Sequence, residues 1–323
     1  MDTTYETNLL REFNNFLSER KYEAAHQFII THNDLQSMKL LNNFGWFYMN
    51  IGTAGAAENS LWYKRYDKAE ECFRKGIRFA SEQNSHFIYS NYGEALMNLG
   101  KYREAQNILL KSTEFSESIV NQNNLSCCLY HNSLYAEAEK QMEKAVTKIQ
   151  RINVFELINK LRFSLNNMSI FIILYNLACI KSKLNKIDDI KIILNVLLNY
   201  QNCHLIDIDD IDIMDILCIA YMCKEYSTVV RLFPKSNYAI DEICFGIYVS
   251  SMLHIDQSPE SFYNGVTEDY REELSNMRSE SAKKELEDRL KKIEEVYESL
   301  MFNNNSAFNI FPRPIKGNYL FFE

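Results

Sequence analysis

A pattern of large and small residues recurs after 33 residues in the middle of the chain. In "YGEALMNLGKYREAQNILLKS", its members are Tyr92, Gly93, Leu96, Gly100, Tyr102, Ala105, Leu109 and Ser112. The matching positions downstream hold Leu125, Ser126, Leu129, Ser133, Tyr135, Ala138, Met142 and Ala145. Every position keeps its size class, which indicates an internal repeat. A repeated unit of this length buries its apolar face only by stacking on its neighbours, so the chain is predicted to be an array.

Looser copies of the unit extend the array in both directions. One contains Phe44 and Gly45 and is interrupted by the stretch "IGTAGAAENSLW"; another contains Leu177 and Ala178. An N-terminal copy contains Tyr22, and a fifth full unit, with Leu217 and Cys218 as its large and small residues, is predicted to have a turn one residue shorter. In each copy, apolar residues recur three and four positions apart in two segments joined by a short turn. This spacing predicts a pair of amphipathic helices.

The pattern resembles the tetratricopeptide repeat, a helix hairpin of about 34 residues with a W-x2-L-G-x2-Y…A-x3-F signature. The resemblance covers residues 8–233 and departs from the signature in its first position, which holds Tyr89 in one copy and Gln122 in the next. The resemblance implies an all-α solenoid of about five to six hairpins, with a scaffold function rather than a chemistry.

Four regions are predicted along the chain. They are an N-terminal hairpin of the tetratricopeptide type, a superhelix of such hairpins, C-terminal capping helices, and an extended or disordered tail, with bounds 1–36, 37–233, 234–300 and 301–323. The repeat pattern is lost past Pro234, where a charged amphipathic segment, "SESAKKELEDRLKKIEEVYESL", follows. Such helices fit a capping role, because a terminal repeat needs its apolar face covered.

The small residue of each unit is predicted to lie where the two helices of a hairpin approach most closely. Gly93, Ser126 and Ala178 hold this position, and a bulky side chain there would force the helices apart. A glycine inside a helix costs about 1 kcal/mol relative to alanine, so Gly93 needs such a packing reason.

An asparagine directly precedes the large and small pair in four successive units. These residues are Asn43, Asn91, Asn124 and Asn176; the fifth unit is predicted to have Ile216 there. The position lies off the stripe that packs inside the hairpin, on a face shared with residues three, four and seven positions away. First helices line the concave surface of a tetratricopeptide superhelix, so this face is predicted to line a groove. The other predicted site residues on it are Trp46, Asn50, Glu94, Asn98, His131 and Lys183.

An asparagine side chain offers an acceptor and a donor that match those of an extended peptide backbone. Peptide-binding superhelices of the resembled family use asparagine ladders in this way. The alternative is a structural role, since the chain is rich in asparagine and the family often has asparagine at this position.

The leading functional hypothesis is a non-enzymatic scaffold that binds an extended peptide or a partner segment in its concave groove. The alternative is a peptide-sensing regulatory protein that acts through its C-terminal helices. Two further hypotheses are an enzyme in the C-terminal third, where no catalytic motif occurs, and a groove occupied by the chain's own aromatic tail after Phe308.

The composition and charge of the chain limit which partners, cofactors and cellular locations are expected. The net charge of −8 and the pI near 5.4 argue against nucleic acid and anionic membranes as partners. The apolar run from Ser169 is too short to cross a bilayer, and no secretory leader is recognised, so a cytoplasmic location is expected. No cofactor or metal is expected: the six histidines lack ligand spacing, and the acidic run 207–215 lacks the glycine and final glutamate of a calcium loop. The oligomeric state is left open.

Overall fold

The computed structural model describes residues 3–32, 34–50, 64–81, 85–151, 164–202, 210–233 and 242–302. Within these ranges the regular elements are helices, and the same ranges contain no β-strand. The chain divides into two compact units near residue 153, and each is described by itself. The predicted all-α architecture is confirmed. Beyond Phe302, the predicted tail 301–323 lies outside the described residues. Occupation of a groove by this tail therefore stays a prediction.

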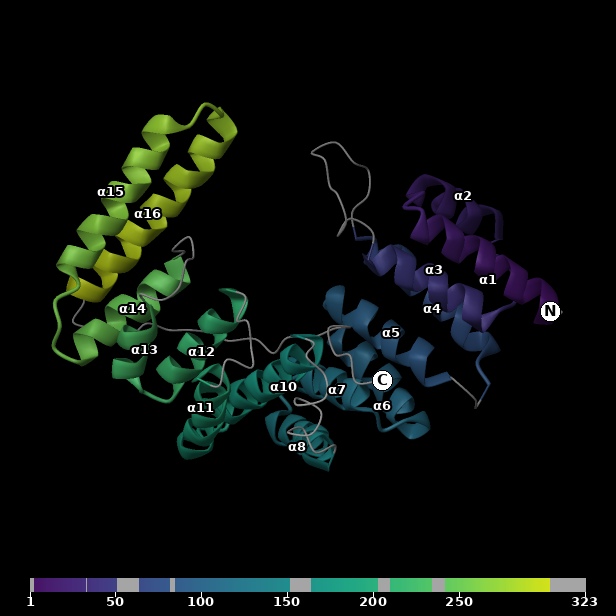
Figure 1. Ribbon diagram of the computed structural model, residues 1–323. Coiled ribbons are helices and arrows are strands. Elements are labelled where there is room, and N and C mark those ends of the chain that lie inside the picture. Colours follow the sequence, from purple (N-terminus) through teal and green to yellow (C-terminus); the bar gives the residue numbers. More distant parts are fainter. Residues whose placement is uncertain are drawn as a thin grey trace. The chain divides into compact units, whose positions relative to one another are not determined.

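Consecutive helices of the first unit pack as antiparallel hairpins, α1 with α2, α3 with α4, α5 with α6 and α7 with α8 (Figure 1). Their bounds are Thr3–Ser18 (α1), Tyr22–His32 (α2), Met38–Asn50 (α3), Tyr66–Gly76 (α4), Ser85–Asn98 (α5), Tyr102–Phe115 (α6), Ile119–His131 (α7) and Tyr135–Arg151 (α8), with a 3-10 turn, η1, at Ile77–Phe79. Successive first helices also contact each other, α3 with α5 and α5 with α7. Side chains on these helices therefore lie on adjoining surfaces.

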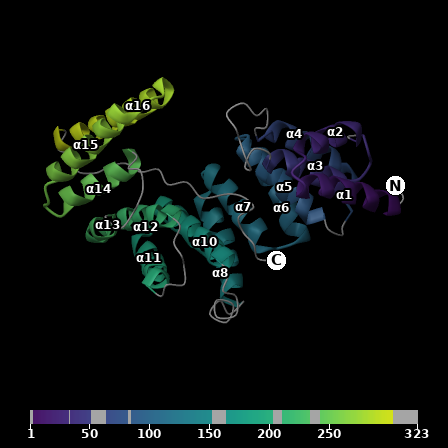
Figure 2. The same cartoon turned by 45° about the horizontal axis from the view of Figure 1, so that its top comes forward.

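The second unit contains further helical hairpins and ends in three helices that share one hydrophobic core. Its helices are α10 (Ser164–Lys183), α11 (Ile187–Asn202), α12 (Asp210–Met222), α13 (Tyr226–Leu232), α14 (Glu242–His254), α15 (Glu260–Asn276) and α16 (Glu280–Phe302). Helices α15 and α16 lie side by side, and α14 packs on α16 (Figures 1 and 2). Phe245 and Val249 of α14 share a core with Val266 of α15 and Ile293 of α16. No helix in the described ranges has the length and apolar character needed to cross a membrane.

Within the described ranges, the turn at the end of a first helix has the same geometry in six places. In each, one residue has a positive φ between 55° and 74°, and the next N–H donates to the carbonyl five residues back over 2.8–3.0 Å. The positive-φ residues are Arg20, Gly100, Ser133, Asn185, Lys224 and Asp256. This is the C-terminal cap in which a left-handed residue satisfies the last carbonyl groups of a helix. The second helix begins two residues later in the first five cases.

This turn corrects two details of the predicted repeat. The fifth hairpin has no shortened turn, because Lys224 and Tyr226 keep the spacing of Gly100 and Tyr102. Counted back from the turn, the asparagine position of that unit is Asp215, not Ile216. The same turn also recurs at Asp256, past the point where the sequence pattern is lost. The sequence misplaced the register because Lys224 has a conformation that lysine rarely adopts.

The structure bears out the close approach predicted at Gly93. A Cβ atom built there would lie 2.4 Å from the Cγ and Cδ2 atoms of Leu109 on α6. The equivalent Gly45 is equally close to the ring of Phe73 on α4. In the next hairpin, the small residue Ser126 donates its hydroxyl to the carbonyl of Ala138 over 2.6 Å. These positions hold the paired helices together and leave the other faces of α3, α5 and α7 for other contacts.

Candidate functional site

The predicted binding face begins on α3, where two asparagines bond to their own helix. The side chain of Asn43 is half-buried and donates from Nδ2 to the Lys39 carbonyl over 2.9 Å. Asn50 donates in the same way to the Trp46 carbonyl over 2.8 Å. Among the described residues, no group donates to the side-chain oxygen of Asn43. That oxygen is an acceptor at the surface of the first unit.

On α5, an amide pair joins two successive hairpins. Asn91 is half-buried and donates from Nδ2 to Oδ1 of Asn42 on α3 over 3.0 Å. This hydrogen bond joins the first helices of neighbouring hairpins, which is the structural role left open for these asparagines and not a contact to a peptide. One turn on, Asn98 donates to the Glu94 carbonyl over 3.1 Å, and the Glu94 side chain is buried. Sequence reasoning missed Asn42, although the doublet "NN" at 42–43 contains it.

Two large aromatic side chains flank these amides. Trp46, one turn after Asn43 on α3, is 43% exposed, and Phe87, one turn before Asn91 on α5, is 42% exposed. Phe87 was not among the predicted site residues, although it lies on the same helical face as Asn91. Exposed aromatic rings next to amides that keep hydrogen-bonding capacity provide both an apolar anchor and backbone contacts for a peptide.

The remaining predicted residues have different surroundings. Asn124 on α7 and Asn176 on α10 have no exposed surface, and Asn124 accepts a bond of 3.4 Å from Nδ2 of Asn123. His131, at the end of α7, stacks on the ring of Tyr102 with centroids 4.3 Å apart. Lys183, at the end of α10 in the second unit, is exposed. The structure therefore places Asn43 and Asn91 at the surface and Asn124 and Asn176 in the interior; ligand contact by any of them stays a prediction.

Comparison with known proteins agrees with this architecture. Residues 88–118, which span α5 and α6, match the family model of the tetratricopeptide repeat. A crystal structure of a tetratricopeptide repeat protein from Parabacteroides merdae superposes with a TM-score of 0.58 over 89% of this chain and 98% of that one, at 13% identity. The chain contains a tetratricopeptide repeat and has the fold of a tetratricopeptide repeat protein. Repeats of this type generally mediate contacts between proteins, and the fold is a scaffold fold.

A second structural match adds less to the description of this tetratricopeptide repeat protein. The complex of Naa15 and Naa10 bound to HypK-THB aligns with 91% of this chain and 39% of that chain, at 11% identity and a TM-score of 0.32, which is too low to support an argument. No curated protein matches the sequence. Within the described ranges, no three His, Cys, Asp or Glu side chains gather in a way that could hold a metal ion. Residues 207–209 of the acidic run 207–215 lie outside those ranges, and α12 begins within the run at Asp210.

Proposed function

We propose that this protein binds an extended peptide, or an extended segment of a partner protein, against the first helices α3 and α5. One observation supports the proposal above all: the exposed rings of Trp46 and Phe87 flank the surface amides of Asn43 and Asn91. The amides can pair with any peptide backbone, whereas the rings prefer peptides that carry apolar side chains.

The buried asparagines take a different part in this proposal. Asn124 and Asn176 occupy the same position of the repeat but are not exposed, so a peptide cannot reach their side chains in this conformation. We therefore assign the ligand contacts to α3 and α5. The regulatory alternative needs the same peptide contact and adds a response in α14–α16.

The test begins with peptides selected from a random library on the immobilised full-length chain. Affinities are then measured for Trp46→Ala, Phe87→Ala and Asn43→Ala, with Phe115→Ala as the control. Phe115 on the second helix α6 is 42% exposed, which matches the two aromatics of the site. Loss of an aromatic anchor is expected to weaken binding about tenfold or more. Loss of the Asn43 amide is expected to weaken it about threefold to tenfold.

The control variant separates this site from a general effect of surface aromatics. Phe115→Ala is expected to bind the selected peptides as the unaltered chain does. Equal affinities for all four variants would refute the assignment to α3 and α5. A loss seen only with Phe115→Ala would place the peptide on the second helices instead.

A further inference from the structure

A cavity of about 250 Å³ lies among α2, α3 and α4 of the first unit. Its lining residues are His26, Ile29, Ile30, Tyr48, Arg65, Lys68, Glu71 and Cys72. None of these residues belongs to the peptide-binding face proposed on α3 and α5. Residues of α2, of α3 and of α4 with its N-cap meet here, and the first and last of them are 46 positions apart in the sequence, so the cavity is a product of the tertiary structure.

The floor of this cavity is uncharged. Ile29, Tyr48 and Cys72 are almost completely buried. The Tyr48 hydroxyl is hydrogen-bonded to Nδ1 of His26 over 3.0 Å, and the two rings are nearly perpendicular at 83°. Burial raises the pKa of both the Tyr48 phenol and the Cys72 thiol to about 12, so both groups are neutral near pH 7. The Tyr48 hydroxyl and His26 Nδ1 satisfy each other, so the floor offers a ligand mainly aromatic and aliphatic surface.

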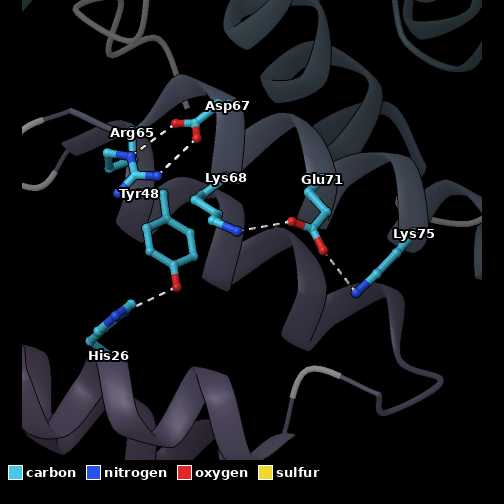
Figure 3. Close-up of polar contacts among 7 residues, drawn as sticks. All are labelled: His26, Tyr48, Arg65, Asp67, Lys68, Glu71 and Lys75. Atoms are coloured by element: carbon cyan, nitrogen blue, oxygen red, sulfur yellow. Dashed lines mark hydrogen bonds and ion pairs between the residues drawn. The ribbon is translucent and has the colours of Figure 1, made fainter.

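The rim is charged and has an excess of cations (Figure 3). Arg65 donates from Nε and Nη2 to the two carboxylate oxygens of Asp67 over 3.0 and 2.9 Å. Glu71 lies between Lys68, at 3.4 Å, and Lys75, at 3.2 Å. Among the lining residues, Arg65 and Lys68 are cations and Glu71 is a carboxylate, which leaves one net positive charge on the lining. The pKa of Asp67 and that of Glu71 are held below their ordinary values by these partners, so both carboxylates stay ionised near neutral pH.

The volume of the cavity and its lining residues together indicate which kind of side chain it would bind. Pockets for small molecules usually measure about 300–1,000 Å³, so this smaller cavity has room for a single side chain. An aromatic ring fits best, because it meets the perpendicular rings of Tyr48 and His26 and the cations of Arg65 and Lys68. Ile30, which is 56% exposed, extends the apolar surface beyond the cavity. The excess positive charge of the rim favours acidic residues on either side of the inserted ring.

We propose that this cavity is a second docking site, which takes one aromatic side chain from an acidic segment of a partner protein. The site lies apart from the asparagine-bearing face, so it adds a second point of attachment to the scaffold. A partner that engages both sites would be held more tightly than either contact alone allows.

The experiment uses the full-length chain with labelled isoleucine methyl groups and three synthetic peptides. The peptides are acetyl-EDFDE-amide, the same peptide with Ala for Phe, and acetyl-KKFKK-amide. The methyl signals of Ile29 and Ile30 are expected to shift saturably with the acidic Phe peptide, at an affinity about tenfold or more above that of the Ala peptide. Equal binding of the Phe and Ala peptides would overturn the proposal, because only surface charge would then be involved.

A charge reversal at the rim provides the matched variants. Lys68→Glu is expected to weaken the acidic Phe peptide and strengthen the basic one, each by about fivefold, since a rim charge contributes little individually. Lys144→Glu, an exposed position on α8, makes the same charge change away from the cavity and is expected to alter neither. Circular dichroism checks that both variants fold. Identical peptide affinities in Lys68→Glu and the unaltered chain would refute the charged rim.

The two proposals can fail separately. Trp46→Ala and Phe87→Ala remove the anchors of the first site and are expected to leave the methyl shifts of Ile29 and Ile30 with the acidic Phe peptide unchanged. Loss of those shifts in both variants would show that the peptide reports on the α3 and α5 face, and would overturn the second site while leaving the first in place.

Discussion

The substitution Gly93→Ala tests the close approach on which the hairpin packing depends. The new Cβ would lie 2.4 Å from two atoms of Leu109, whereas carbon atoms in favourable contact are about 3.5–4.0 Å apart. Leu109 is fully buried, so it has no open space into which to move. Either α5 and α6 separate or Leu109 leaves its preferred rotamer.

The expected cost follows from two opposing terms. Overpacking a tight core costs about 1–3 kcal/mol, while alanine is favoured over glycine in a helix by about 1 kcal/mol. The net expectation is a loss of about 1–2 kcal/mol in the free energy of unfolding, because the clash involves the branch point of Leu109 and not a flexible chain end. For a unit of this size, the midpoint of thermal unfolding should fall by about 2–8 °C.

Gly265 provides a matched control in α15. A Cβ atom built there meets no atom within 4 Å, so Gly265→Ala should stabilise the chain by about 1 kcal/mol through helix propensity alone. Unfolding in urea is followed by far-ultraviolet circular dichroism for both variants. Tryptophan fluorescence adds a probe of the N-terminal region, because both tryptophans lie at or before residue 62.

A second background separates the clash from other effects. Leu109→Ala opens a cavity and should cost about 2–5 kcal/mol by itself. In that background, Gly93→Ala should stabilise the chain by up to about 1 kcal/mol, since the methyl group then has space and alanine favours the helix. The packing argument is wrong if Gly93→Ala stabilises the unaltered chain as Gly265→Ala does, or destabilises it equally in both backgrounds.

Two further predictions concern the turns and the charged rim. Gly100→Ala should lower the free energy of unfolding by about 1–2 kcal/mol, because φ at Gly100 is +74°. Lys224→Gly should raise the free energy of unfolding by up to about 1 kcal/mol, because φ at Lys224 is 63°. Urea unfolding measures both changes. The lowered pKa values of Asp67 and Glu71 mean that their ion pairs stabilise the folded state at neutral pH and that this contribution is lost as the pH falls below about 4. Both side chains are partly exposed, so the loss is less than about 1 kcal/mol, and it should disappear from the pH dependence of the unfolding midpoint in Asp67→Asn with Glu71→Gln.

Each of these has a clear contrary result. Equal stability of Gly100→Ala and the unaltered chain would contradict the strained turn, and a destabilised Lys224→Gly would show that the lysine side chain contributes more than its backbone costs. An unchanged pH profile in the double carboxylate variant would show that the ion pairs at the rim do not stabilise the fold.

The helical hairpins could be predicted from the sequence because their determinants are local. Gly93 and Leu109 are 16 residues apart and pack within one hairpin, so the spacing of large and small residues carries the information. The register of the fifth hairpin could not be predicted in the same way. In its turn, Lys224 has a left-handed conformation. The clearest copy has a glycine at this position, and a glycine indicates such a conformation in the sequence whereas a lysine does not.

The exposure of the asparagines was decided by the tertiary structure. Asn43 and Asn124 occupy the same position of the repeat, yet one is half-buried and the other has no exposed surface. The sequence period places a side chain on a face of its helix, but burial depends on what the rest of the chain packs against that face. In the same way, the bond from Asn91 joins a residue 49 positions away. The sequence by itself determined the repeated helix pairs and the residues that hold them together, because these contacts lie within one unit. Only the tertiary structure decided which polar side chains a partner can reach and where α2, α3 and α4 enclose a cavity, because both depend on contacts between units of the repeat.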